Sequence, residues 1–183
     1  MIVTGNEALA SRMRMLSCFG MTSAWERRKS DEIIIPRFVE LGYNYKLSDV
    51  AAAIMLMQMK KVDVIIRKKR ELAEHYGKAL KGIDSLTPPY VDASCMHAFQ
   101  NYVVMVDEKL SRNRLISLLR NEGIEASFGT YALHLQPVYG SKSDCPNALH
   151  AFDHSLSLPM FHALTFEQID FIVAKLKSFV SEA

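Results

Sequence analysis

The hydrophobic and polar positions divide the chain into an N-terminal part of long helical patterns and a C-terminal part of short alternating elements. Apolar side chains along one side predict a helix over about residues 7–16. The short apolar run at 1–4 before it favours a buried strand. Because such a strand needs neighbours on both sides, we expect it to belong to a larger sheet. The stretch from 19 to 42 has no clear period, and a connection of this length is typical of a functional loop or of a mobile surface loop.

A long second helix is predicted from Ser48, whose hydroxyl suits an N-cap. No helix breaker follows before Gly77 or Gly82. The first half, 50–57, is apolar on every side, which indicates burial, whereas the charged second half is expected to be exposed to solvent. Roughly thirty residues at 1.5 Å each would extend about 45–50 Å, so we expect the helix to bridge two bodies.

After Gly82 the pattern predicts a small α/β domain. The final helix is the clearest of its elements, because Thr165 and Gln168 form a capping-box pattern before an apolar periodic run. The other expected elements are strands at 102–106, 124–128 and 155–158 and helices at 111–121 and 146–154.

The charge balance argues against nucleic acid and anionic membranes as partners. The formal net charge is only +2 over 183 residues. The basic cluster at 67–70 is followed by Glu71 and Glu74, which favours a solvated helix face; DNA binding through this helix stays a minor alternative. The apolar stretch at 50–57 is far too short to cross a bilayer, and no secretory signal is evident.

The cysteines and histidines do not suggest a metal site. Cys18, Cys95 and Cys145 are far apart and odd in number, which favours reduced thiols in a cytoplasmic protein. His150 and His154 stand four apart and can share a helix face, but no third ligand is obvious beside them. We interpret the pair as part of a polar helix face and predict no metal.

Three segments carry a resemblance to a known family. The most specific is 41–53, a Gly-Tyr-Asn-Tyr-Lys-Leu-Ser-Asp run that opens an apolar helix, and the segments 133–139 and 156–160 support it. In this order they resemble the DegT–StrS family of sugar-nucleotide aminotransferases, and the resemblance covers essentially the whole chain. It implies the aspartate-aminotransferase fold, a pyridoxal 5'-phosphate (PLP) cofactor and a homodimer. The implied reaction moves an amino group, from glutamate, onto a keto-sugar nucleotide for surface-polysaccharide synthesis.

The lysine that such an enzyme needs has no match here. In the family it usually ends a Ser-Phe-x-x-x-Lys pattern, but Ser-Phe occurs only at 127–128 and 178–179, and neither leads to such a lysine. PLP needs an amine nucleophile and a carboxylate near its ring nitrogen. We therefore expect no catalytic residue and no PLP binding in this chain alone. The resemblance implies a large-domain remnant with an active-site loop at 1–47, a bridging helix at 48–81 and the C-terminal small domain at 82–183.

The resemblance also assigns candidate binding residues. Asn44 matches the asparagine that reaches the cofactor phosphate across the dimer, although an asparagine before a helix is commonly a turn residue. Trp25 and Arg27 lie in the loop that resembles the substrate-side loop, and His134 matches a histidine near the sugar nucleotide. Each has a structural alternative: Trp25 as packing for its loop, and His134 as a lone structural histidine.

A non-catalytic role remains open beside the enzyme fragment. A genuine half-length relative would act as a regulatory or interaction module. The apolar surface of residues 50–59 would then need a partner, through homodimerisation or a companion chain.

Overall fold

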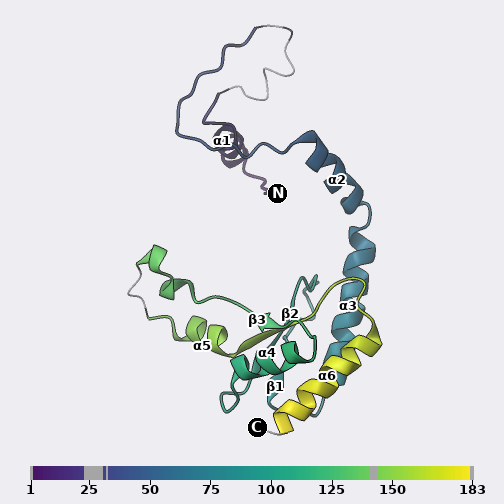
Figure 1. Cartoon of the computed structure of the whole chain (residues 1–183). Helices are drawn as coiled ribbons and strands as arrows, with labels where there is room; N and C mark the ends of the chain where they lie inside the picture. The colour runs from purple at the N-terminus through teal and green to yellow at the C-terminus, as the bar shows by residue number, and fades with distance from the viewer. Residues whose placement is uncertain (1, 23–30, 32, 141–143, 182–183) are drawn as a thin grey trace. The chain divides into compact units, whose positions relative to one another are not determined.

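The computed structural model describes residues 2–22, 31, 33–140 and 144–181. The chain forms two compact units, Met1–Lys60 and Lys61–Ala183 (Figure 1). None of the helices built from described residues has the length and apolarity of a bilayer span. The helices and strands are α1 (Glu7–Ser17), α2 (Asp49–Met59), α3 (Val62–Ala79), β1 (Leu86–Thr87), β2 (Tyr102–Val106), α4 (Arg112–Asn121), β3 (Ser127–Phe128), α5 (Pro146–His154), β4 (Ser155–Leu158) and α6 (Phe166–Ser181), with 3-10 turns η2 (Leu133–Leu135) and η3 (Pro137–Tyr139).

The first unit confirms the first predicted helix but not the strand before it. Asn6 is the N-cap of α1, because its side-chain oxygen accepts a hydrogen bond from the Leu9 amide at 3.0 Å. Ile2 and Val3 are exposed, and neither pairs with any strand of the described residues. The prediction of a buried strand at 1–4 was therefore wrong for this chain, since an apolar run becomes a strand only where a neighbouring strand accepts its hydrogen bonds.

The predicted long helix is two helices. Ser48 caps α2 as expected, accepting from the Ala51 amide at 3.2 Å. The helix then ends at Met59, because ψ departs from its α-helical value to −19° at Lys60 and −7° at Lys61. The side chain of Lys61 makes no capping hydrogen bond. The expectation that α2 is buried all round also failed, since none of its residues is buried in this chain.

The charged second half of the predicted helix is half-buried rather than solvated. Leu72, Ala73 and Tyr76 lie along one side of α3 and are buried, and this side packs against α6. The charges gather on the remaining faces. The expectation that this half is exposed to solvent therefore holds for charged residues such as Arg70 and Glu71 but not for its apolar stripe, because a helix with abundant charge can still present one apolar side to a core.

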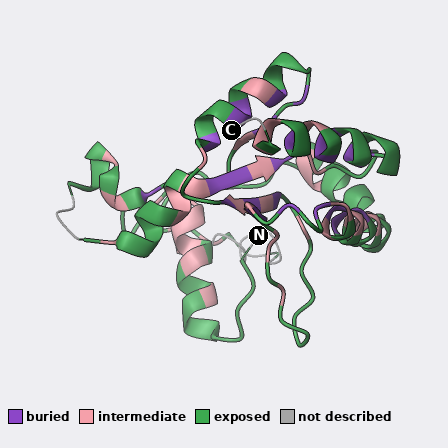
Figure 2. Ribbon diagram, turned by 90° about the horizontal axis from the view of Figure 1, so that it is seen from below, coloured by how far each residue is buried: buried purple, intermediate pink, exposed green. Residues whose placement is uncertain are grey.

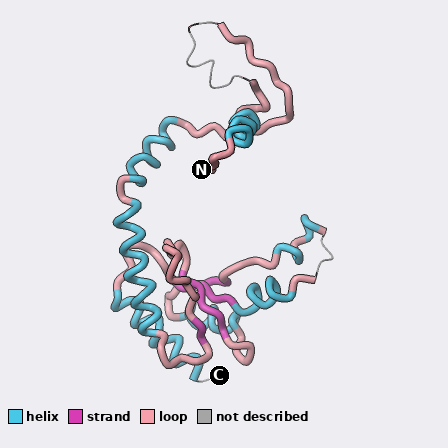
Figure 3. Tube along the Cα trace, turned by 180° about the vertical axis from the view of Figure 1, so that it is seen from behind, coloured by secondary structure: helices cyan, strands magenta, loops and turns pink. Residues whose placement is uncertain are grey.

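The second unit confirms the predicted α/β class with an antiparallel sheet. In the described part of this unit the strand order is β1-β2-β4-β3, and every pairing is antiparallel (Figure 3, strands magenta). The central pairing sets Val104 opposite Leu156. Along β2 the side chains alternate between buried and half-buried, as a period of two requires.

One continuous core fills the second unit. Figure 2 shows the buried residues gathered on the strands and on the inner sides of the helices. The rings of Tyr76 and Tyr102 stack within it, with centroids 4.6 Å apart, and the Tyr76 hydroxyl donates to the Pro159 carbonyl at 3.0 Å. The largest fully buried side chains are Tyr76, Tyr102, Leu72, Leu80, Leu119, Leu156, Ile169, Leu176 and Val104.

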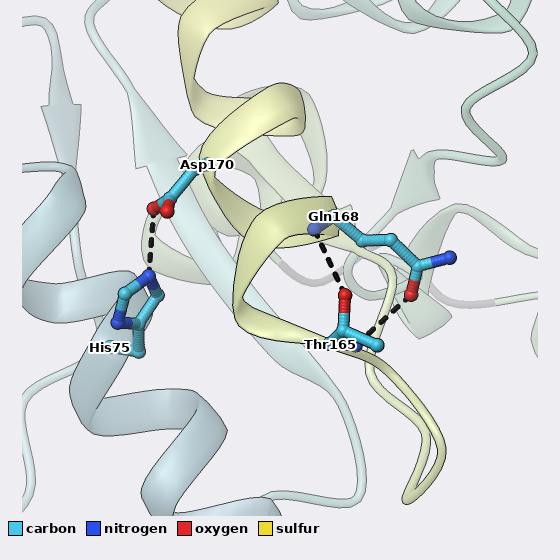
Figure 4. A network of polar contacts seen from close by, with 4 residues as sticks. All are labelled: His75, Thr165, Gln168 and Asp170. Carbon is cyan, nitrogen blue, oxygen red and sulfur yellow. Dashed lines mark hydrogen bonds and ion pairs between the residues drawn. The ribbon is translucent and has the colours of Figure 1, made fainter.

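The start of α6 is fixed by local and long-range polar contacts (Figure 4). The Gln168 amide donates to the Thr165 hydroxyl at 3.2 Å, and the Thr165 amide donates to Gln168 Oε1 at 3.0 Å. These reciprocal bonds are the capping box that the sequence predicts. One turn on, Asp170 contacts His75 Nε2 at 2.7 Å and so ties α6 to α3.

We expect Thr165→Ala to lower the free energy of unfolding by about 1 kcal/mol, because the Gln168 amide loses its acceptor. Urea unfolding of the full chain, followed by far-UV circular dichroism, measures the loss. Thr165→Ser is the matched control, since it keeps the hydroxyl and should stay close to the wild type. Equal destabilisation by both substitutions would contradict the role of the cap.

Candidate functional site

Residues 43–45, within the most specific segment of the family resemblance (41–53), are hydrogen-bonded to the end of α1. Backbone bonds on both sides of Asn44 hold it in an extended conformation, and Asn44 itself pairs with Cys18 in an antiparallel bridge. Fixed backbone on either side of an amide side chain is what a ligand-binding residue needs. The bonds run from the Tyr43 amide to the Leu16 carbonyl at 2.7 Å, from the Phe19 amide to the Tyr43 carbonyl at 2.8 Å, and from the Tyr45 amide to the Ser17 carbonyl at 2.9 Å.

Two glycines allow this pairing. A Cβ on Gly42 would lie 2.0 Å from the Gly20 amide nitrogen, and a Cβ on Gly20 would lie 1.8 Å from the Glu40 carbonyl oxygen. Both clashes are with backbone, so no side-chain rotation relieves them. Gly20 also has a φ of +72°, which L side chains rarely adopt. The turn therefore needs glycine at both positions.

We expect Gly42→Ala to separate the 42–45 segment from the end of α1, because the added methyl collides with the Gly20 backbone. Amide cross-peaks of residues 16–20 and 42–45 in a ¹H–¹⁵N spectrum should shift or broaden, while those of the second unit stay in place. Gly5→Ala is the control, since a Cβ there meets nothing within 4 Å. An unchanged spectrum for Gly42→Ala would contradict this packing.

The side chains of the segment alternate between two faces. Tyr43 and Tyr45 stack with ring centroids 5.0 Å apart and 7° between their planes, and both line an open hollow of about 720 Å³ beside α1. Asn44 does not line that hollow and is exposed. In extended backbone successive side chains point to opposite faces, so the amide of Asn44 projects away from the tyrosine pair. Among the described residues no hydrogen bond engages that amide, which leaves its donors available to a ligand.

Lys46, the next cation along the segment, is held locally. Its Nζ lies 4.4 Å from the centroid of the Phe19 ring, an arrangement that cation–π attraction favours. Lys46 is exposed, and no lysine in the described ranges is buried. A lysine that forms a Schiff base is usually activated by desolvation or by a neighbouring cation.

The remaining predicted site residues fall elsewhere. His134 is half-buried in η2, between the exposed side chains of Leu133 and Leu135. Asn44 belongs to the first unit and His134 to the second, so the chain does not assemble them into one site within either unit. Trp25 and Arg27 lie outside the described residues.

The structure adds one residue that the sequence analysis missed. Glu108 lies in the turn after β2, and its carboxylate approaches His150 Nδ1 at 3.5 Å. The sequence shows no third ligand near His150 and His154, but the fold brings Glu108 beside them as a possible third ligand. No local signal could have found it, because the turn and α5 are far apart along the chain.

The fit of these residues to PLP is partial. Asn44 offers an amide donor to a phosphate oxygen, and the glycine-dependent turn holds it in place. The described residues provide no buried lysine as a covalent anchor. The described residues therefore fit a contact to the cofactor phosphate but not its covalent attachment, and we derive no catalytic step through the cofactor.

Comparison with curated proteins identifies a relative. The spore coat polysaccharide biosynthesis protein SpsC of Bacillus subtilis is 31% identical over 193 residues, which cover 100% of this chain and 50% of that protein. The chain therefore spans about half the length of the curated relatives it matches.

Solved structures agree in fold. The aminotransferase TlmJ of Streptoalloteichus hindustanus superposes with a TM-score of 0.83 at 26% identity, covering 97% of this chain and 46% of that one. The PLP form of the sugar aminotransferase Spr1654 of Streptococcus pneumoniae has a TM-score of 0.80 at 20% identity, covering 98% and 45%. The second likeness concerns the fold alone.

The profile of one family matches nearly the whole sequence. Residues 1–177 match the DegT/DnrJ/EryC1/StrS aminotransferase family. The match includes the 41–53 segment, whose backbone pairing and glycine packing are described above. This chain therefore belongs to the DegT/DnrJ/EryC1/StrS aminotransferase family, of whose members it represents a C-terminal portion.

Proposed function

We propose that this chain is the C-terminal portion of a PLP-dependent aminotransferase. The whole enzyme transfers an amino group, from glutamate, to a keto-sugar nucleotide in the synthesis of a surface or coat polysaccharide. The observation that carries the proposal is end-to-end similarity to one half of such proteins, including one that acts in spore coat polysaccharide biosynthesis. The sequence has no Ser-Phe-x-x-x-Lys segment, and the described residues hold no buried lysine. These two observations support a second part of the proposal: the chain alone neither binds PLP covalently nor turns over substrate.

Within the intact enzyme we assign roles by the family resemblance. Asn44 donates to the cofactor phosphate across a homodimer, and its free amide on a rigid turn supports that role. Trp25, Arg27 and His134 contact the sugar-nucleotide substrate. The intact protein acts in the cytoplasm, in keeping with three free cysteines, and needs no nucleic acid or membrane.

Dimerisation is supported by the surface of α2. Ile54 and Leu56 are 60% and 66% exposed, although the helix is apolar all round. An exposed apolar helix of this kind marks an interaction surface or the side of a larger body. We assign it to the homodimer and to the large domain of the intact enzyme.

The coding DNA upstream of Met1 gives the first test. An open frame that continues through about 150–200 further codons, one more domain's worth, with a Ser-Phe-x-x-x-Lys segment, is expected. The protein from that extended frame should form a Schiff base with PLP and aminate a keto-sugar nucleotide, while the 183-residue chain does neither. An in-frame stop before Met1 would overturn the enzyme assignment for this chain.

The phosphate contact has its own test in that extended protein. Asn44→Ala should weaken PLP retention during dialysis, because the phosphate loses an amide donor. The matched control is Asn101→Ala, an exposed asparagine of the second unit, which should retain PLP as the wild type does. Equal retention by both variants would remove Asn44 from the cofactor site.

A second candidate function is a half-length interaction protein. The same α2 surface favours it, because the chain itself leaves that surface uncovered. Light scattering of the purified chain separates the cases: self-association that Leu56→Glu abolishes supports a surface that needs a partner. A stable monomer would argue against both forms of dimer.

A further inference from the structure

Three metal-binding side chains converge at one place in the second unit, independently of the proposed function. Glu108 follows β2, and His150 and His154 stand one helical turn apart on α5. One ligand atom from each residue lies within 4.8 Å of the other two. The imidazole rings of the histidines are 4.7 Å apart between centroids, and His150 Nδ1 lies 3.5 Å from Glu108 Oε1. Two secondary-structure elements thus bring a His, His and Glu set together.

His154 lacks a hydrogen bond that a structural histidine would make. Its Nδ1 is buried and has no partner in the described part of the chain. Buried polar atoms normally make hydrogen bonds, and a buried polar atom without a hydrogen-bond partner is destabilising. Within the described residues Nδ1 of His154 therefore has no internal donor or acceptor, as expected for an atom whose partner is a ligand.

Helix and turn provide a suitable scaffold for an ion. α5 contacts β2 and β3, so both histidines stand on an element fixed to the sheet. Glu108 and His150 are exposed, so an ion can reach them from solvent and their side chains can close around it. Ligand bonds of about 2.0–2.2 Å place tetrahedral donors roughly 3.3 Å apart, which requires only small rotations of these exposed side chains.

We propose that Glu108, His150 and His154 bind a divalent transition cation, with Zn²⁺ the preferred ion and water completing the shell. Two imidazoles and a carboxylate are a ligand set that zinc uses with an open fourth position. The set is too rich in nitrogen for Mg²⁺ or Ca²⁺, which prefer oxygen ligands. The carboxylate also offsets part of the charge of the ion.

Bound metal would join α5 to the turn after β2. The chain between them in sequence includes η2, which carries His134, so an ion here fixes one end of the segment that presents His134. The role that we propose for the site is to hold α5 against the turn after β2.

Calorimetric titration of the full chain with Zn²⁺ alone, at about pH 7.5 where free imidazole is neutral, tests the site. One equivalent is expected to bind. His150→Ala and Glu108→Gln should each weaken binding by about tenfold or more. His162→Ala removes an exposed histidine outside the cluster and should bind as the wild type does.

The visible absorption spectrum of bound Co²⁺ distinguishes binding at this cluster from binding at the three free thiols. Co²⁺ bound to the cluster should give visible ligand-field bands without thiolate-to-metal charge transfer, and His150→Ala should abolish them. No binding by the wild type, unchanged binding by both exposed variants, or a thiolate charge-transfer band that persists in His150→Ala would overturn the proposal. Far-UV circular dichroism verifies that each variant is folded.

Discussion

Raising the pH from about 10 to about 12 is expected to destabilise the second unit sharply, because the two tyrosines stacked in its core ionise more readily in the unfolded chain than in the folded one. Burial raises the pKa of Tyr102 from 10.0 to about 12. Burial raises the pKa of Tyr76 as well, and the neighbouring Tyr102 adds to that shift. Both hydroxyls hold their protons more tightly in the folded state than in the unfolded state.

The sign of the effect follows from these raised pKa values. The stabilisation is complete below the unfolded pKa near 10 and is lost as the pH rises towards the folded pKa. For Tyr102 the shift from 10.0 to about 12 corresponds to about 3 kcal/mol. The loss from Tyr76 adds to this, because its hydroxyl must also stop donating to Pro159.

Guanidinium unfolding midpoints between about pH 8 and pH 12 measure this loss. Tyr102→Phe should flatten part of the pH dependence, because it keeps the ring and removes one titrating hydroxyl. Tyr90→Phe is the matched control, since Tyr90 is 87% exposed and should leave the profile unchanged. A Tyr102→Phe profile as steep as that of the wild type would rule out Tyr102 as the cause.

Elements with local signals were predicted well from the sequence. The caps at Ser48 and Thr165 lie where their side chains accept the expected backbone bonds. The alternating strand at 102–106 and the helix at 146–154 also occur with those bounds. Each of these signals is contained in a few consecutive residues, which is why the sequence alone identifies them.

Elements that depend on distant partners were predicted poorly. The apolar run 1–4 has the composition of a strand, but none of the described residues pairs with its described part, residues 2–4. The apolar pattern of α2 predicts burial, yet the chain leaves it exposed, because burial depends on what covers a helix and not on its composition. The break at Lys60–Lys61 carries no glycine or proline to mark it.

The candidate site divides in the same way. The motif around Asn44 was recognisable from the sequence, but its rigidity depends on Gly20 and Gly42 meeting across a turn, which no local pattern shows. The contact between Glu108 and His150 likewise depends on the fold, which brings the turn after β2 next to α5. Sequence thus indicates which residues carry chemistry, and long-range packing decides which of them meet.

Leu176→Ala is expected to cost about 2–5 kcal/mol of folding free energy, the range for removing a fully buried leucine. Leu176 is 0% exposed on α6 and belongs to the core of the second unit, so the substitution would leave a cavity in that core. Because small domains are stable by only about 5–15 kcal/mol, this loss is a large share of the total.

Urea unfolding of the full chain tests this, with the midpoint expected to fall and the slope to stay unchanged. Leu149→Ala on α5 is the control, because that leucine is 38% exposed and should cost about 1 kcal/mol or less. If both substitutions lower the free energy of unfolding by the same amount, the side chain of Leu176 does not anchor α6 in the core. A large difference would show that the second unit depends on the packing of α6 at Leu176.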